Sequence, residues 1–261
     1  MVDTNPDAEA PSGTRPFFII GGRHSGSESL YRVLSAHPEI ALTNEAQLVN
    51  ALCFCFEYCT QPAGTINIEK EFRGVVHADV IPRFSEIFFT HTKQMLEDYY
   101  AAAFDKPFKR WGDTMSDPGW AMAAQRIFPD VQFVVQVRDP RDVFCAQSQD
   151  GIRAGAAFEV RANMPAQEEA NSWNNTYEYI LKEPGDQHLL TYEQLVADPV
   201  DCASKVLGFL GLEMDPAVER AAADLGSDDA GVGRWEGTLD AAEVSKFEEL
   251  CGTLMKQFGY L

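Results

Sequence analysis

Basic residues are scarce in this chain. Lysine and arginine together number 21, against 40 aspartate and glutamate residues, which gives a formal net charge of −19 at pH 7. Nucleic acids and anionic membranes attract proteins through basic surfaces, so this balance disfavours a nonspecific grip on either partner. Any anionic ligand must therefore be held by a local cluster of arginine side chains and backbone N–H groups.

Long apolar runs and targeting signals are also lacking. No run approaches the roughly 18 residues that indicate a membrane span. Residues 1–16 are polar, acidic and proline-containing, without the basic start and apolar core of a secretion signal. We expect residues 1–16 to form a disordered tail. We also expect the protein to be cytoplasmic and to have no membrane partner.

Cysteine and histidine are few, at six and five of 261 residues. Without an export signal, six cysteines in a chain of this length indicate reduced thiols rather than a disulfide framework. Cys53, Cys55 and Cys59 are close in sequence, but no fourth ligand lies nearby, and the segment around them is apolar and aromatic. We therefore expect buried helical thiols and no metal site.

The rest of the composition, with 45% hydrophobic and 23% charged residues, is that of a globular protein, and the length suits one α/β domain over residues 17–261. Apolar runs predict strands, and amphipathic segments predict helices. Strands are expected from residue 17, from about residue 40, and at 107–111, 132–137 and 188–191; helices are expected at 44–58, 86–104, 118–127, after Pro199 and at 240–258; 113–119 is expected to be loop. This alternation predicts a mainly parallel central sheet flanked by helices, with ligands at the carboxyl ends of the strands.

The most informative segment is residues 17–34, where an apolar strand leads through a glycine-bracketed loop into an amphipathic helix. Gly21 and Gly26 allow tight turns, and the first N–H groups of the helix lack intrahelical partners, so the loop is suited to a phosphate or sulfate. Ser27 and Glu28 occupy the positions where a Walker motif has Lys and then Ser or Thr, which disfavours ATP hydrolysis. Glu28 is equally consistent with helix capping together with Ser25.

A second polar segment follows the expected strand at 132–137. Arg138 leaves the end of that strand, where its planar fork can bind a phosphate bidentately, and Asp139-Pro140 begins a helix. The alternative is structural. In that interpretation Arg138 and Asp142 form an ion pair that caps the helix, and Arg141 lies on the surface.

Four segments together resemble the sulfotransferase family, in particular its bacterial and tyrosylprotein-type branch. They are 17–45 with its Ser-Ala-His-Pro-Glu-Ile run, 128–143, 190–212, and Gly233-Arg234-Trp235 to the C-terminal Gly-Tyr. The resemblance implies a P-loop NTPase-like sulfotransferase fold. It also implies transfer of a sulfuryl group from 3′-phosphoadenosine 5′-phosphosulfate (PAPS) to a hydroxyl or amine.

The resemblance also implies roles for individual residues. The first loop would bind the 5′-phosphosulfate, Arg138 the 3′-phosphate, and the Gly-Arg-Trp segment the 3′-phosphate and adenine end. Glu45 matches the catalytic base, His24 is a second catalytic candidate, and Tyr192-Glu193 would join sheet to helix. The nucleotide-binding candidates are Arg23, His24, Ser25, Gly26, Ser27, Glu28, Ser29, Arg138, Ser148, Tyr192, Gly233, Arg234 and Trp235.

The chain departs from the family pattern at several of these positions. His24 replaces the usual Lys or Arg, Ser27-Glu28 replaces Thr-Thr, Ala146 replaces a Ser with Ser148 two residues on, and Thr114 replaces the Lys of a Gly-Asp-Lys-Thr-Pro segment. Two cationic contacts to the sulfuryl are thus missing. A protonated His24, or the neighbouring Arg23, Lys109 or Arg110, could replace them.

Two functions follow from these matches and departures. The first is an active PAPS-dependent sulfotransferase, and the second is a catalytically impaired protein that keeps the fold as a nucleotide- or partner-binding module. The acceptor could be a small molecule, a glycan or a peptide, and residues 50–125 and 150–180 would shape the pocket that binds it. The sequence does not indicate an oligomeric state. His77 and His91 lie in the region expected to line the acceptor pocket, where either could serve as a base. The aromatic residues that could form an acceptor cleft, or serve core packing instead, are Phe84, Phe88, Phe89, Trp111 and Trp120.

Overall fold

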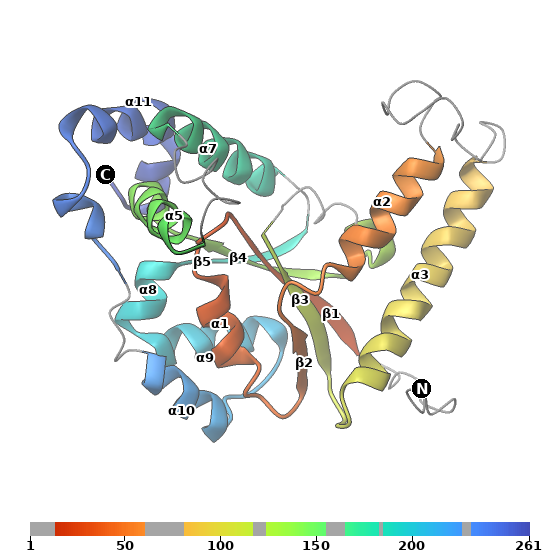
Figure 1. Ribbon diagram of the computed structural model, residues 1–261. Coiled ribbons are helices and arrows are strands. Elements are labelled where there is room, and N and C mark those ends of the chain that lie inside the picture. The colour runs from red at the N-terminus through yellow and green to blue at the C-terminus, as the bar shows by residue number, and fades with distance from the viewer. Residues whose placement is uncertain (1–13, 61–80, 117–123, 155–164, 183–184, 226–230) are drawn as a thin grey trace.

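A sheet of five parallel strands forms the centre of the computed structural model, which describes residues 14–60, 81–116, 124–154, 165–182, 185–225 and 231–261 (Figure 1). The strand order is β2-β3-β1-β4-β5, and every neighbouring pair is parallel. The strands are β1 (Arg15–Gly21), β2 (Ile40–Thr43), β3 (Arg110–Met115), β4 (Gln132–Val137) and β5 (Asp186–Thr191). The predicted α/β class, with helices flanking a parallel sheet, is confirmed.

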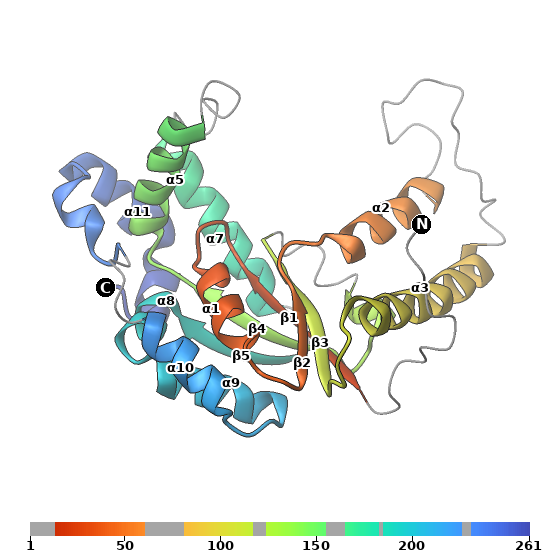
Figure 2. The same ribbon diagram turned by 60° about the horizontal axis from the view of Figure 1, so that its bottom comes forward.

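Side chains of the central strands alternate between two buried layers, so both faces of the sheet are covered. Phe17 and Ile19 of β1 face one apolar cluster, whereas Phe18 and Ile20 face the other. On the first face lie α1 (Ser27–Leu34), α8 (Tyr192–Ala197), α9 (Pro199–Leu210) and α10 (Pro216–Leu225) (Figure 2). On the second lie α5 (Pro140–Ala154), α7 (Ala166–Lys182) and α11 (Ala241–Phe258), and a short 3-10 helix, η3, spans Arg234–Gly237.

The third strand differs from its sequence prediction. A strand was expected at 107–111 and a loop at 113–119, but β3 runs from Arg110 to Met115, with the polar residues Asp113 and Thr114 inside it. Both side chains are buried, at 3% and 2% exposed. These polar side chains can be buried in a strand because neighbouring backbone and side-chain groups form hydrogen bonds with them. The local sequence does not reveal those partners.

Helices α2 (Leu48–Thr60) and α3 (Ile81–Ala103) extend from the sheet beside each other (Figure 1). Phe56 of α2 packs against Phe84, Phe88 and Phe89 of α3, with ring centroids 4.7–5.8 Å apart. These rings, proposed from sequence as an acceptor cleft or as core, therefore pack against one another, and Trp111 is likewise in the core at 1% exposed. Trp120 and His77 lie outside the described residues.

The cysteine prediction is partly wrong. All three clustered cysteines lie in α2, and Cys53 is buried, which raises the pKa of its thiol to about 12. Cys55, in contrast, is exposed. The side chain of Cys59 lies outside the described residues. Of the helices in the described ranges, none is both long and apolar enough to cross a membrane.

Candidate functional site

The loop between β1 and α1 lies at the carboxyl end of the sheet, as the sequence predicted. Gly26, the N-cap residue of α1, has the left-handed φ of 88°, and no side chain caps the helix there. The capping role considered for Glu28 with Ser25 is therefore wrong, because the residue before the helix is a glycine with no side chain to offer. Among the described residues no side chain satisfies the first N–H groups of α1, an arrangement suited to an anion.

The two loop glycines are required by close packing. A Cβ atom at Gly26 would come within 2.1 Å of the Tyr192 ring, and one at Gly21 within 2.5 Å of the Gln136 carbonyl oxygen of β4. The Tyr177 hydroxyl joins the same strands, since it donates to the Gln136 carbonyl at 2.9 Å and accepts from the Gly22 N–H at 3.1 Å. Larger residues at these glycines would push the loop out of place.

Arg138 connects the end of β4 to this loop. Its side chain is mostly buried, and its guanidinium donates to the backbone oxygens of His24 at 3.2 Å and Gly231 at 3.1 Å. The guanidinium also lies 4.6 Å from the centroid of the Tyr192 ring. The Tyr192 ring therefore packs close to both Gly26 and the Arg138 guanidinium, and it helps to orient the arginine.

The segment around η3 is held by the start of α5. The Asp142 carboxylate accepts from the N–H groups of Gly233 at 2.7 Å and Trp235 at 3.0 Å, and burial raises the pKa of this carboxyl while those hydrogen bonds oppose the rise. Arg141 was expected on the surface but is 5% exposed, because it pairs with Asp139 at 2.6 Å and lies 3.8 Å from the Trp235 ring centroid. That surface assignment is wrong.

Glu193 holds the same region together. One of its carboxylate oxygens accepts from the Asp139 N–H at 3.0 Å and the other from the Tyr260 hydroxyl at 2.8 Å. Burial raises the pKa of the Glu193 carboxyl, and these hydrogen bonds oppose the rise. The residue therefore joins α8 to the start of α5 and to the C-terminus.

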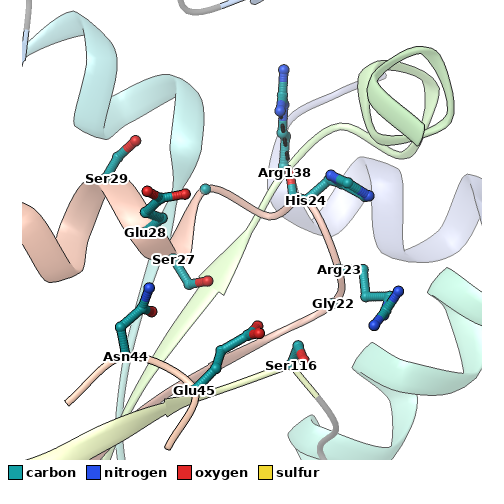
Figure 3. A pocket seen from close by; sticks show the side chains of 11 residues that line it. Gly22, Arg23, His24, Ser27, Glu28, Ser29, Asn44, Glu45, Ser116 and Arg138 are labelled. Carbon is teal, nitrogen blue, oxygen red and sulfur yellow. Dashed lines mark hydrogen bonds between the residues drawn. The ribbon is translucent and has the colours of Figure 1, made fainter. Parts of the chain in front are cut away.

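Glu45 lies on the turn between β2 and α2, on the opposite side of the loop from Arg138 (Figure 3). Its backbone is left-handed, with a φ of 51°, and its N–H donates to the Thr114 hydroxyl at 2.9 Å. The side chain is exposed, and its carboxylate points toward the loop (Figure 3).

One pocket of about 400 Å³ joins the loop, Arg138 and this turn. Its described lining comprises Gly22, Arg23, His24, Gly26, Ser27, Glu28, Ser29, Asn44, Glu45, Ser116 and Arg138. The side chains of Ser27, Asn44 and Glu45 gather on one side, whereas Arg23 and His24 extend from the other side of the loop (Figure 3). We call residues 22–29 with Arg138 the loop wall, and Asn44, Glu45 and Ser116 the turn wall.

Other sequence candidates are placed differently. Ser25 is buried, at 1% exposed, and is not part of the described lining. The Gly233-Arg234-Trp235 segment is also not in that lining, but it adjoins Arg138 through Gly231. The side chain of Ser148 lies outside the described residues.

Two proposed replacement cations are at the wrong edge of the sheet. Lys109 pairs with Glu39 at 2.7 Å, and the Arg110 guanidinium donates to the Leu210 carbonyl at 2.6 Å. Both lie at the amino end of β3, where Arg110 is in register with Arg15, because the strand begins three residues later than expected. Among the described residues, the cations lining the pocket are Arg23 and Arg138, with His24 as a titratable third.

Sequence reasoning missed two residues of the turn wall and one that supports it. Ser116 and Asn44 line the pocket, and Asp113 lies behind the turn, but none was proposed as a site residue. A Gly-Asp pair after an expected strand was the available signal, and it was interpreted as loop. Two histidines outside the site are structural: His37 contacts the Glu213 carbonyl at 3.1 Å, and burial lowers the pKa of His188. His91 is exposed on α3.

Together, the fold and pocket define a parallel α/β protein with a glycine-bracketed loop and a pocket at the carboxyl edge of its sheet. A model of the sulfotransferase family matches residues 16–216, so the chain belongs to the sulfotransferase family. No curated protein sequence is similar enough to count as a match.

Solved structures agree on the fold. Sulfotransferase STF9 from Mycobacterium avium is 13% identical, with a TM-score of 0.56 and coverage of 97% of this chain and 79% of that one. The sulfotransferase domain of the Synechococcus PCC 7002 olefin synthase is 17% identical, with a TM-score of 0.55 and coverage of 94% and 97%. Mouse sulfotransferase SULT7A1, solved as a complex with PAP, is 15% identical, with a TM-score of 0.55 and coverage of 97% and 91%.

Proposed function

We propose that this protein transfers a sulfuryl group from PAPS to a hydroxyl or amine of an acceptor. The observation that carries this proposal is that the β1–α1 loop, Arg138 and Glu45 line one shared pocket. The complex of mouse SULT7A1 with PAP, the desulfated donor 3′-phosphoadenosine 5′-phosphate, supports the choice of donor. An activity screen determines the class of the acceptor, which is a small molecule, a glycan or a peptide.

The loop wall is suited to the donor. Uncapped N–H groups at the start of α1 would hold the 5′-phosphosulfate, and the Arg138 fork would take the 3′-phosphate. Because Arg138 is already held by Tyr192 and two backbone oxygens, little side-chain entropy is lost when it binds. The Gly233-Arg234-Trp235 segment, fixed by Asp142, would close the adenine end.

The chemical step needs one proton acceptor and a stabilised leaving group. The acceptor oxygen or nitrogen attacks sulfur in line, and Glu45 takes its proton. The bond between sulfur and the bridging phosphate oxygen breaks, and PAP leaves with the electron pair. Loop N–H groups stabilise the charge that develops on the departing phosphate.

His24 is the residue on the loop that can replace the missing cation. It lines the pocket with a left-handed φ of 56°, so its ring is displayed by the same strained turn that exposes the loop N–H groups. A protonated His24 would offset the negative charge of Glu28, which also lines the pocket. Arg23 adds a second positive charge on that side of the loop.

The test is turnover of PAPS with a panel of alcohols, amines, sugars and tyrosine peptides, with sulfated product and PAP identified by mass spectrometry. We expect product with at least one acceptor class, and a loss of about a hundredfold to ten-thousandfold in turnover for Glu45→Gln, because a general base contributes on that order. Glu219→Gln, on an exposed carboxylate of α10, is the matched control. Full activity of Glu45→Gln, or no sulfated product with any acceptor, would contradict the proposal.

A further inference from the structure

The turn that presents Glu45 has an unfavourable backbone. Glu45 and Gln47 have φ values of 51° and 57°, in the left-handed region that residues other than glycine seldom occupy. Both side chains are exposed, so burial of these residues does not hold the turn in this shape. Such a conformation persists only where surrounding contacts impose it, and strained residues of this kind concentrate at functional sites.

Asp113 of β3 supplies several of these contacts. One carboxylate oxygen accepts from the Thr43 hydroxyl at 2.9 Å and the Ala46 N–H at 3.2 Å, and the other accepts from the Gln47 N–H at 3.1 Å. The side chain is 3% exposed, and burial raises the pKa of its carboxyl while the hydrogen bonds oppose the rise. One buried carboxylate therefore contacts the turn on both sides of Glu45.

Thr114, the next residue, contacts the turn at its centre. Its hydroxyl accepts from the Glu45 N–H at 2.9 Å and donates to the Asn44 side-chain oxygen at 2.6 Å. The side chain is 2% exposed and is not in the described pocket lining, whereas Asn44 and Glu45 are. Thr114 therefore acts on the pocket through these two residues.

We propose that Asp113 and Thr114 are positioning residues that hold the Glu45 carboxylate in line with the attacking group of the acceptor, an inference that rests on the proposed function. Thr114 stands where the sulfotransferase pattern has a lysine, and in this chain it holds the proposed base, Glu45, in place. The Thr114 hydroxyl accepts from the backbone N–H of Glu45 and donates to the side chain of Asn44, which it orients. Thr114 therefore lacks the positive charge that a lysine would bring to the transferring group. Its hydroxyl instead holds the turn wall through Glu45 and Asn44.

Substitutions at Thr114 test this role. Thr114→Val keeps the shape of the side chain and removes the hydroxyl, so we expect turnover of PAPS to fall about a hundredfold through misplacement of the base. The KM for the donor and the affinity for PAP should stay unchanged, because the loop wall is not touched. Thr114→Ser restores the hydroxyl and should restore turnover. Thr92→Val, at a buried threonine of α3 that is 4% exposed, is the matched control.

Asp113→Asn is the second variant. The amide retains one acceptor oxygen but turns an NH₂ group toward the N–H groups of the turn, so we expect faster hydrogen exchange at residues 44–47 and a fall in turnover without loss of PAP binding. This variant decides the question if Thr114→Val does not fold.

The outcomes separate the two proposals. Wild-type turnover in Thr114→Val, with Glu45→Gln inactive, would overturn the positioning role and leave the proposed function standing. Equal losses of turnover and PAP binding, or no rescue by Thr114→Ser, would also overturn it, since those results indicate general destabilisation. Full activity of Glu45→Gln would overturn the proposed function and this inference together.

Discussion

The two walls of the pocket are built by different means. The loop wall depends on backbone geometry and on two glycines that allow β1, β4 and Tyr192 to pack closely. The turn wall depends on two buried polar side chains from the neighbouring strand, Asp113 and Thr114, which hold a strained backbone. Residues 22–29 of the loop wall are continuous in sequence, with Arg138 added from the end of β4, whereas the placement of the proposed base depends on residues some 70 positions away in the sequence.

The walls differ in charge as well as in construction. Arg23, His24 and Arg138 line the loop wall, and Glu45 lines the turn wall. Glu28 is the exception, a carboxylate on the loop wall in the first turn of α1. At a helix N-terminus a carboxylate is favoured by the helix dipole, so Glu28 is placed to stabilise α1, although it would repel the proposed anionic donor.

The largest expected effect breaks the loop wall alone. Gly26→Ala places a methyl group within 2.1 Å of the Tyr192 ring and forces alanine to a φ of 88°, so we expect a loss of about 3 kcal/mol in unfolding free energy and loss of PAP binding. Gly208→Ala is the matched control. Nothing lies within 4 Å of a Cβ there, so it should raise stability by about 0.5–1 kcal/mol. Urea denaturation and calorimetry measure both, and a fully stable, PAP-binding Gly26→Ala protein would refute the close packing.

A smaller effect is expected in the η3 segment, which adjoins the loop wall through Arg138. Asp142→Ala leaves the N–H groups of Gly233 and Trp235 without their acceptor, so we expect a loss of about 2 kcal/mol and weaker binding of PAP. Hydrogen exchange at residues 44–47 should not change, because the turn wall is held independently. Asp105→Ala, at an exposed residue, is the control. Faster exchange in the turn would show that the two walls are coupled.

The smallest expected effect concerns pH. Burial raises the folded-state pKa of Glu193 above its ordinary 4.5, so its favourable contribution is fully present below that pH and is lost as pH rises through the raised value. The stability of wild type relative to Glu193→Gln should therefore decrease from pH 4.5 to neutral pH. Chemical denaturation at a series of pH values measures this difference. A relative stability that rises with pH would mean that the hydrogen bonds outweigh burial.

Local sequence was sufficient for much of the fold and for half of the site. The strand at 132–137, the loop after Gly21 and the end of the last helix before Gly259 were all predicted, because apolar runs and glycines act over short distances. Long helix α7 was not predicted, since its polar residues obscure its apolar stripe. Helix α3 begins at Ile81, five residues before the predicted start.

The errors share a physical cause. Asp113 and Thr114 are read as loop residues from sequence, yet they are buried in β3 because the 43–47 turn satisfies them. Arg141 is read as a surface residue, yet Asp139 and the Trp235 ring bury it. In each case a polar side chain is buried by partners that are distant in sequence, and a single sequence does not identify those partners.

Calorimetry with PAP tests most directly whether residues 22–29 and Arg138, which together make the loop wall, form one nucleotide site. We expect wild type to bind PAP, Arg138→Ala to bind roughly tenfold to a hundredfold more weakly through loss of charged hydrogen bonds, and Arg220→Ala, on the exposed side of α10, to bind as wild type does. Absence of PAP binding by wild type, or equal affinity in wild type and Arg138→Ala, would contradict the account.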